Sequence, residues 1–285
     1  MRNIIKFIIL FYFYLLYSLK ELLGKERKEP IVRVLILHYV SENELGKLAN
    51  LVDKLSKDWD FISGEEFSLF KEGKISLKRK SLLITFDDGF LSSKFASDNV
   101  LAPRNIKSIF FISPGFIDTF GNDQKTYQFL SKNLRLNNID ASNIPNHFKP
   151  MSWDDVRSLY KNGNIVGSHT LYHDKVSLSF QQGELVRDLL ESKIRLEKEL
   201  GGSLVSEFAF PFGNIESICF DSYKQSEEVY LNVYSGFRGE NYIGETGIVK
   251  RDAIDLSAPS FYTKAYLLGA SDVFYKGILR GFLKV

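Results

Sequence analysis

Two short segments of this sequence bring together side chains that bind cations or transfer protons. The first is the carboxylate pair Asp87-Asp88, which follows an apolar run and precedes a glycine. The second is the imidazole pair His169 and His173, which also follows a short apolar stretch. Carboxylates and neutral imidazoles are the usual protein ligands of zinc and similar divalent ions. One carboxylate and two imidazoles would form a metal site with open positions for water and substrate.

Each segment alone has an ordinary structural explanation. An Asp-Asp-Gly sequence is typical of a turn that ends a strand, and a histidine pair is more often a surface or core feature than a ligand set. Adjacent residues of a strand point to opposite sides, so the two carboxylates could take different roles. One could hold a cation while the other moves a proton. The two segments together therefore predict a metal-dependent active site.

Strands of a parallel sheet must position these residues. Residues 81–86 are apolar apart from Ser81 and Thr85, which is typical of a strand covered on both faces. The carboxylates then follow its carboxyl end, where α/β proteins bind their ligands. Strand and helix patterns alternate along the chain, which favours parallel pairing with right-handed crossovers. We therefore expect an α/β fold whose sheet has seven or eight strands.

The composition is that of one globular domain. The chain has 285 residues, of which 44% are hydrophobic and 25% are charged. Its net charge of +2 is too small to indicate nucleic-acid binding, and no basic stripe interleaved with aromatic residues stands out. With a single cysteine, Cys219, the chain has no intrachain disulfide framework. We expect this cysteine to be a small buried apolar residue.

Several segments, in order along the chain, resemble the motifs of the polysaccharide deacetylases, carbohydrate esterase family 4. Residues 85–89 and the His169-x-x-x-His173 segment are similar to the first two motifs of that family. Further similar segments are residues 34–41, 109–112, 151–155 and 208–213. The resemblance extends from about residue 32 to about residue 256. It implies a distorted (β/α) barrel and the hydrolysis of the N-acetyl group of a sugar.

The same resemblance implies roles for particular residues. It assigns Asp87 as the general base and Asp88, His169 and His173 as metal ligands. The expected metal is zinc, with cobalt, manganese and iron as alternatives.

The third motif, residues 208–213, carries the oxyanion site of the family. By resemblance, the backbone N–H of Phe212 lies in the oxyanion hole, and Pro211 fixes the turn. The rings of Phe210 and Phe212 would line the acetyl pocket. Packing in the strand core is the alternative role for both rings.

Two departures from the family pattern leave roles to be filled. Many members carry an arginine in the third motif that holds the base, and here that position is Ala209. Arg251 is our candidate substitute, with an ordinary surface cation as the alternative. Many members also have a late histidine as general acid, and this chain has none after His173. His38, at the end of the first strand, is our candidate; His147, a water, or a purely structural His38 are the alternatives.

The N-terminal segment differs from the rest of the chain. Residues 4–23 are apolar except at Lys6, Ser18, Lys20 and Glu21, and many are aromatic. The uninterrupted run is shorter than the ~20 residues that cross a bilayer, and no small-residue cleavage site follows it. We expect an uncleaved helix that lies on or anchors to a membrane, with packing on the barrel as the alternative. Basic residues on both flanks leave its orientation open.

We divide the chain into three parts. Residues 1–29 form the N-terminal helix and linker, residues 30–261 the deacetylase-like barrel, and residues 262–285 an amphipathic tail. In the tail, basic residues at four-residue spacing could touch a membrane, although such helices usually pack on the domain; they are Lys276, Arg280 and Lys284. Residues 121–149 are polar and rich in asparagine, and we expect a surface loop that contacts substrate.

The resulting hypothesis is a metal-dependent hydrolase. It would remove the N-acetyl group from an N-acetylated sugar of a cell-envelope polysaccharide or of a lipid-linked saccharide. One alternative is a deformylase or amidase acting on a lipid-linked amino sugar. Another is a catalytically impaired scaffold that binds saccharide. The expected partners are an N-acetylated glycan and a membrane surface, and the expected location is the membrane-associated cell envelope, on either side of the membrane.

Overall fold

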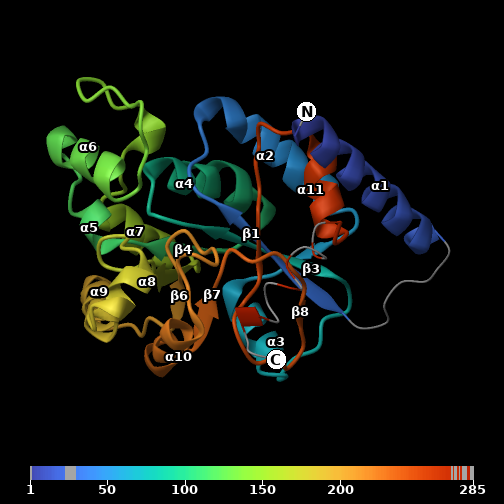
Figure 1. The fold of residues 1–285 in the computed structure, drawn as a ribbon. Helices are drawn as coiled ribbons and strands as arrows, with labels where there is room; N and C mark the ends of the chain where they lie inside the picture. The colour runs from blue at the N-terminus through green and yellow to red at the C-terminus, as the bar shows by residue number, and fades with distance from the viewer. Residues whose placement is uncertain are drawn as a thin grey trace.

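In the computed structural model, helices surround one mostly parallel sheet (Figure 1). The structure describes residues 2–22 and 30–270, and of the later residues only 272, 275, 277, 281 and 282. Its strands are β1 (Ile31–Leu37), β2 (Asp60–Phe61), β3 (Ser81–Phe86), β4 (Ser108–Ile112), β5 (Ile165–Ser168), β6 (Glu207–Ala209), β7 (Asn232–Tyr234), β8 (Asn241–Tyr242) and β9 (Arg251–Ala253). The order is β7-β6-β5-β4-β3-β1-β8, with β2 paired to β3 and β9 paired to β1.

The two ends of the parallel sheet meet close to β9. Tyr234 of β7 forms a parallel bridge with Val249, two residues before β9, and β9 in turn pairs with β1. Hydrogen bonds from Val249 N–H to Val233 O (2.8 Å) and from Arg251 N–H to Phe237 O (2.8 Å) join the two ends. The sheet is thus nearly closed, and the expected distorted (β/α) barrel is confirmed. The two-residue strands β2 and β8 bring the described sheet to nine strands, more than the expected seven or eight.

The core lies on both sides of this sheet. Inward-pointing residues fill the barrel, among them Val34, Leu83 and Phe111. Outward-pointing residues such as Leu35 and Ile84 pack under the surrounding helices. All six residues of β3 are buried, which confirms the expectation of a strand covered on both faces.

Eleven α-helices lie in the described part of the chain. They are α1 (Arg2–Leu22), α2 (Glu42–Leu55), α3 (Gly64–Lys71), α4 (Leu91–Ala96), α5 (Pro114–Ile117), α6 (Asp123–Lys132), α7 (Trp153–Lys161), α8 (Val176–Gln181), α9 (Leu185–Glu199), α10 (Phe220–Val229) and α11 (Ser260–Leu267). Short polar motifs fix several helix starts. At α3, Ser63 Oγ accepts from Glu66 N–H (3.2 Å), and the Glu66 carboxylate accepts from Ser63 N–H (2.8 Å).

We expected residues 121–149 to form a surface loop, but this polar insertion contains the helix α6. The Asn122 side chain caps this helix by accepting a hydrogen bond from Lys125 N–H (3.0 Å). Thr126, Phe129 and Leu130 form its buried face. The helix is therefore stabilised by burial of one narrow apolar face, which the polar composition conceals.

Two further helix assignments differ from the expectations. The sequence of residues 179–200 predicts one long helix closed by Gly201-Gly202. The structure instead has α8 and α9, separated at Gly183, whose φ of 72° is left-handed. Residues 220–229 form α10, to which the sequence pattern assigns no element. Its buried face contains Ser222, Tyr223 and Ser226, so small polar side chains stand where an apolar stripe would have marked a helix.

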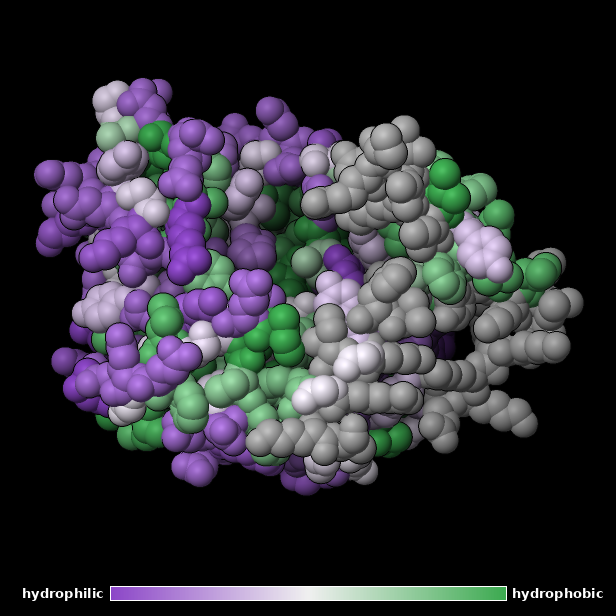
Figure 2. All heavy atoms as spheres, in the orientation of Figure 1, coloured by the Kyte–Doolittle hydropathy of each residue, from purple (hydrophilic) through white to green (hydrophobic). Residues whose placement is uncertain are grey.

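Helix α1 packs against α11 on one side of the barrel (Figure 1). Leu10 is buried there with Ala265 and Ala270. The other side of α1 is an exposed apolar stripe, whose hydrophobic surface is visible on the α1 side of Figure 2; it consists of Phe7, Ile8, Phe11, Tyr12, Leu15, Leu16 and Leu19. None of the described helices combines the length and the apolar character that crossing a bilayer requires.

The C-terminal tail is described only at single positions. Arg33 of β1, which is fully buried, binds Asp272 (2.6 Å), and Phe282 is 5% exposed and packs against Phe237. At these positions the tail packs on the barrel. The linker at 23–29 and the basic residues of the tail, Lys276, Arg280 and Lys284, lie outside the described residues. The three-part division of the chain remains a prediction.

Candidate active site

The two histidines and one of the two aspartates converge at the carboxyl end of the sheet. Asp88 Oδ1 is 3.4 Å from His169 Nε2 and 3.3 Å from His173 Nε2. One ligand atom from each of the three side chains lies within 4.8 Å of the others. All three side chains are buried. Residues from two segments about 80 positions apart thus form the three-ligand constellation that the sequence predicts.

Hydrogen bonds orient both imidazoles. His169 Nδ1 is 2.8 Å from the carbonyl oxygen of Ala209, and His173 Nδ1 is 3.2 Å from that of Asn133. A carbonyl oxygen only accepts, so Nδ1 must carry the proton and Nε2 of each neutral ring presents a lone pair to Asp88. Within the described residues, Asp88 Oδ1 has no hydrogen-bond donor. Three buried lone pairs that face one another fit a divalent cation.

The other aspartate, Asp87, is bound by Arg251. Its two carboxylate oxygens accept from the guanidinium at 2.8 and 2.9 Å, and both side chains are buried. Arg251 also donates to Ser235 O (2.8 Å) and to Thr85 Oγ1 (3.2 Å). Burial is the largest single influence and raises the pKa of Asp87, but the charge and hydrogen bonds of Arg251, together with the charges of His169 and His38, outweigh it, so the pKa lies below its ordinary value. The carboxylate is therefore ionised and held in one orientation.

Strand pairing explains how Arg251 reaches Asp87. In the parallel β1–β9 pair, Arg251 lies opposite Val34, and its guanidinium crosses the barrel interior 5.2 Å from the ring centre of Phe111. Ala209, which stands where many family members carry an arginine, is buried in the same interior cluster as Phe111. The structure thus brings an arginine from a different strand to Asp87, rather than leaving it on the surface.

A turn, and not strand alternation, separates the two carboxylates. Strand β3 ends at Phe86, and Asp88 has a φ of 77°, so our premise that both aspartates belong to the strand is wrong. This left-handed residue turns its carboxylate toward the histidines while Asp87 faces Arg251. Three other site residues, Thr170, His173 and Phe212, also have φ values between 59° and 63°. Such strained backbone is concentrated at functional sites.

His38 follows β1 at the same edge of the sheet. Its side chain is exposed, and its charge contributes to lowering the pKa of both Asp87 and Asp88. The backbone joins the two segments, because Asp87 N–H donates to Leu37 O (3.0 Å). His38 therefore lies within electrostatic reach of the two carboxylates.

An aromatic cluster borders this edge. The ring of Tyr39, which is 39% exposed, lies 5.5 Å from His147 and 4.8 Å from Phe148. It also contacts Phe90, two residues after Asp88, at 5.8 Å. His147, our alternative candidate for the general acid, thus belongs to the same aromatic cluster as Tyr39, the residue that follows His38.

The third motif forms a tight turn beside His173. Phe212 has a φ of 63° and is 38% exposed, and its ring packs edge-on against that of His173 at 4.8 Å. Its backbone N–H makes no hydrogen bond within the described residues. Pro211 is buried. Phe210 is 1% exposed and packs against Phe208 at 5.0 Å, so its ring belongs to the core, and its role in an acetyl pocket remains a prediction.

Two residues that support the histidine segment escaped the sequence interpretation. Asn133, at the end of α6, accepts from His173 Nδ1 through its carbonyl and donates from Nδ2 to Tyr172 O (2.8 Å). Asp188 of α9 accepts from Leu171 N–H (3.1 Å), and burial raises its pKa to about 6. The insertion was expected to contact substrate, but nothing in the sequence singled out either residue.

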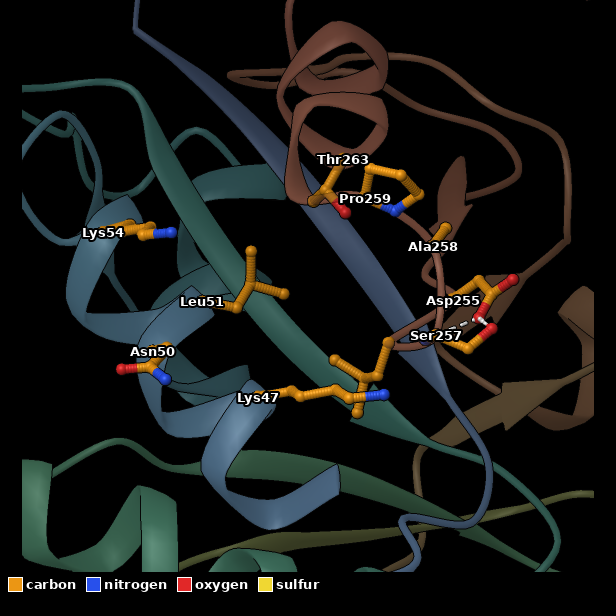
Figure 3. Close-up of a pocket in the computed structure, with 10 residues that line it drawn as sticks. Lys47, Asn50, Leu51, Lys54, Asp255, Ser257, Ala258, Pro259 and Thr263 are labelled. Carbon is orange, nitrogen blue, oxygen red and sulfur yellow. Dashed lines mark hydrogen bonds between the residues drawn. The ribbon is translucent and has the colours of Figure 1, made fainter. Parts of the chain in front are cut away.

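A separate pocket of about 360 Å³ lies between α2 and residues 255–263 (Figure 3). Its lining includes Lys47, Leu51, Lys54 and Asp255. None of the predicted site residues lines it.

The comparisons with known proteins identify the family. The sequence matches the family model for polysaccharide deacetylases over residues 74–228, which is more than half of the chain. The chain belongs to the polysaccharide deacetylase family. No curated protein matches this deacetylase-family sequence.

Solved structures share the fold of this deacetylase-family chain. It is similar to IcaB from Ammonifex degensii, with a TM-score of 0.62 and 20% identity over 85% of this chain and 98% of the other. It is similar to a de-N-acetylase from Aggregatibacter actinomycetemcomitans, with a TM-score of 0.62 and 19% identity over 83% and 99%. It is also similar to the deacetylase PplD from Streptococcus pyogenes, solved with acetate, with a TM-score of 0.62 and 13% identity over 83% and 98%.

Proposed function

We propose that this polysaccharide deacetylase-family chain is a metal-dependent hydrolase. Its substrate would be an N-acetylated sugar of a cell-envelope polysaccharide or of a lipid-linked saccharide. The observation that carries this proposal is the convergence of Asp88, His169 and His173 beside a carboxylate, Asp87, that Arg251 holds ionised. Two of the similar structures are named as a de-N-acetylase and as a deacetylase in complex with acetate, which agrees with this reaction class.

Asp88, His169 and His173 would hold the cation, with Asp88 as the only charged ligand. A divalent cation bound there would lower the pKa of a water ligand and polarise the acetyl carbonyl. Zinc is the first candidate, with cobalt, manganese and iron as alternatives, because the same donor set suits all four.

Asp87 is the general base of the proposed reaction. Arg251 occupies both carboxylate oxygens in the plane of the guanidinium, which fixes the direction of the remaining lone pairs. The ionised carboxylate can accept a proton from the attacking water. Because Arg251 lies in the barrel interior, it orients the base without occupying the substrate side.

The acetyl oxygen gains negative charge as water attacks the carbonyl carbon. The unpaired N–H of Phe212 would donate a hydrogen bond to that oxygen, and its left-handed backbone directs the group away from the strand ladder. Pro211 restricts the same turn. The leaving nitrogen needs a proton, and His38, exposed at the same edge, would supply it.

A membrane surface is the second proposed partner, through α1. The support is the exposed apolar stripe of this helix, in which residues three or four positions apart share one face. Such a helix lies in the interface plane, which would keep the barrel close to an envelope glycan or a lipid-linked saccharide. The proposed location is therefore the membrane-associated cell envelope, with the side left open.

Acetate release is the measurement that tests the proposed function. Purified, zinc-loaded protein should release acetate from oligomers of N-acetylglucosamine, and Asp87→Asn should abolish the release while zinc still binds. Lys125→Gln, on the exposed side of α6, should behave as the wild type. Release of formate but not acetate from matched N-formyl and N-acetyl sugars would favour a deformylase. Zinc binding without any acyl release from a panel of N-acylated glycans would contradict hydrolysis.

A further inference from the structure

An arginine of the insertion lies at the entrance to the metal site. The guanidinium carbon of Arg135 is 4.7 Å from the ring centre of Phe212, and that ring lies 4.8 Å from the ring of His173. The side chain of Arg135 is exposed. Within the described residues, no carboxylate forms an ion pair with it. A positive charge without a protein counter-charge therefore stands next to the proposed oxyanion donor.

The backbone around Arg135 is fixed rather than loosely tethered. Leu134 is buried in a cluster with Phe116, and Leu136 N–H donates to Leu130 O (2.9 Å). Two residues before Arg135, the carbonyl oxygen of Asn133 accepts from His173 Nδ1 (3.2 Å), and the Asn133 side-chain amide donates to Tyr172 O (2.8 Å). Arg135 itself has a φ of 55°, which costs free energy that a merely solvated arginine would not need. The fold thus fixes the backbone from which the Arg135 side chain reaches Phe212.

The contact of Arg135 with the Phe212 ring is a cation–π contact, which does not require the N–H donors of the guanidinium. A guanidinium that lies over an aromatic ring uses its face, while its N–H groups point outward in the ring plane. These donors match the paired oxygens of a carboxylate or phosphate. To bind the hydroxyl groups of a neutral sugar, the uncharged side-chain amide of Asn or Gln would be as good a hydrogen-bond partner as an arginine.

We propose that Arg135 binds an anionic substituent of the saccharide, next to the N-acetyl group that is hydrolysed. The substrate class is therefore an acidic N-acetylated saccharide that carries a carboxylate or a phosphate. This inference rests on the proposed function of the same site. It makes Arg135 a specificity residue that contacts substrate and not a participant in bond cleavage.

The test uses pairs of substrates that differ only in charge. One pair is an oligosaccharide of N-acetylglucosamine and N-acetylmuramic acid and the same oligosaccharide with its carboxylates converted to methyl esters. The other pair is an N-acetylglucosamine oligomer with and without a 6-phosphate. The zinc-loaded full chain is assayed for kcat and KM by acetate release, and for Kd by calorimetry. The variants are Arg135→Gln, Arg135→Lys and, as the matched charge control, Lys125→Gln.

We expect the acidic member of at least one pair to have a kcat/KM about 10- to 100-fold above its neutral partner, mainly through KM. Arg135→Gln should bring this ratio close to 1, Arg135→Lys should retain part of it, and Lys125→Gln should keep it. Which pair shows the preference distinguishes a carboxylate from a phosphate.

Three results would overturn the inference. The first is equal kcat/KM for the acidic and neutral members of both pairs. The second is an equal loss for both members in Arg135→Gln, which would make Arg135 a support of Phe212 only. The third is an equal change in Lys125→Gln, which would indicate general electrostatic attraction. Tighter binding of the acidic saccharides without acetate release would refute the proposed reaction and leave the role of Arg135 standing.

Discussion

Arg251 and Asp87 are 164 residues apart in the chain and form a buried, two-pronged ion pair with N–O distances of 2.8 and 2.9 Å. Removing one partner of such a pair leaves the other buried and uncompensated, which costs about 3–5 kcal/mol. We expect Arg251→Met to lower the free energy of unfolding by this amount and to lower kcat by at least about 100-fold. The double variant Asp87→Asn/Arg251→Met should recover much of the stability and none of the activity. Urea unfolding and acetate release measure both effects, and a double variant as unstable as the single one would contradict the interpretation.

Metal binding should depend on the three converging side chains. A ligand that binds only the folded state stabilises it, by about 2.7 kcal/mol at a concentration of 100 times Kd. Zinc should therefore raise the Tm of the wild type, and a chelator should reverse the rise. His173→Ala should abolish this response. His147→Ala, which removes an imidazole from the aromatic cluster near Tyr39, is the matched control and should respond as the wild type. A full zinc response in His173→Ala would show that the metal binds elsewhere.

The turn after Phe212 should tolerate no added side chain. Gly213 has a φ of 59°, and a Cβ there would lie 2.6 Å from Gly236 N. We expect Gly213→Ala to lower the free energy of unfolding by about 1–3 kcal/mol and to lower kcat, because Phe212 N–H moves. The control is Gly46→Ala in α2, where a Cβ meets nothing within 4 Å. That change should stabilise the helix by about 0.5–1 kcal/mol. Equal effects of the two changes in thermal unfolding would refute the role of the turn.

Asp188 should make stability depend on pH. Its Oδ2 is buried without a hydrogen-bond partner in the described part of the chain, and burial raises its pKa from 3.8 to about 6. The folded state then binds more protons than the unfolded state between pH 4 and 6, so this residue's contribution to stability falls as pH rises through that window and stays low above it. Asp188→Asn keeps the acceptor for Leu171 N–H. Relative to the wild type, this variant should gain about 1–3 kcal/mol between pH 4 and pH 7. A pH-independent difference in urea unfolding would contradict the raised pKa.

The exposed stripe of α1 should govern membrane binding. Leu15 and Leu19 are 51% and 53% exposed on this face. Replacing both by aspartate removes apolar surface that a bilayer would bury, at about 1.5–3 kcal/mol for each fully buried leucine. We expect partitioning to phospholipid vesicles to fall at least about 10-fold, measured by cosedimentation. Leu204→Asp, at an exposed leucine (75%) distant in sequence, is the control. An equal fall in that variant, or no binding by the wild type, would exclude this role for α1.

Local signals in the sequence predicted several of the elements that surround the candidate site. The apolar run predicted the buried strand β3, which the structure has. In the same way, the Ser-x-x-Glu pattern at Ser63 and Glu66 is a local signal for the start of a helix, and α3 begins there. Helices α6 and α10 escaped prediction because their buried faces are narrow or made of small polar side chains such as Ser222 and Ser226. Periodicity detects apolar stripes and not burial itself.

In the candidate site, too, local sequence patterns predicted some features, whereas others depend on tertiary contacts. The spacing of His169 and His173 indicated a ligand pair, and their convergence on Asp88 agrees with it. The left-handed turn at Asp88 and the strain at Phe212 follow from tertiary contacts, which no local pattern records. The approach of Arg251 to Asp87 depends on the β1–β9 register across the whole chain. The family resemblance could therefore suggest Arg251 as a candidate, but only the closed barrel explains how its side chain reaches Asp87.

Closure through β9 also orders events during synthesis. Strand β3 and the two aspartates that follow it are synthesised long before residues 249–253, so a growing chain carries the Asp87 carboxylate without the Arg251 guanidinium until the last strand is added. The buried charge can be tolerated only once that strand is in place. If Asp87 is the general base as proposed, its carboxylate gains its fixed orientation only when the fold is complete.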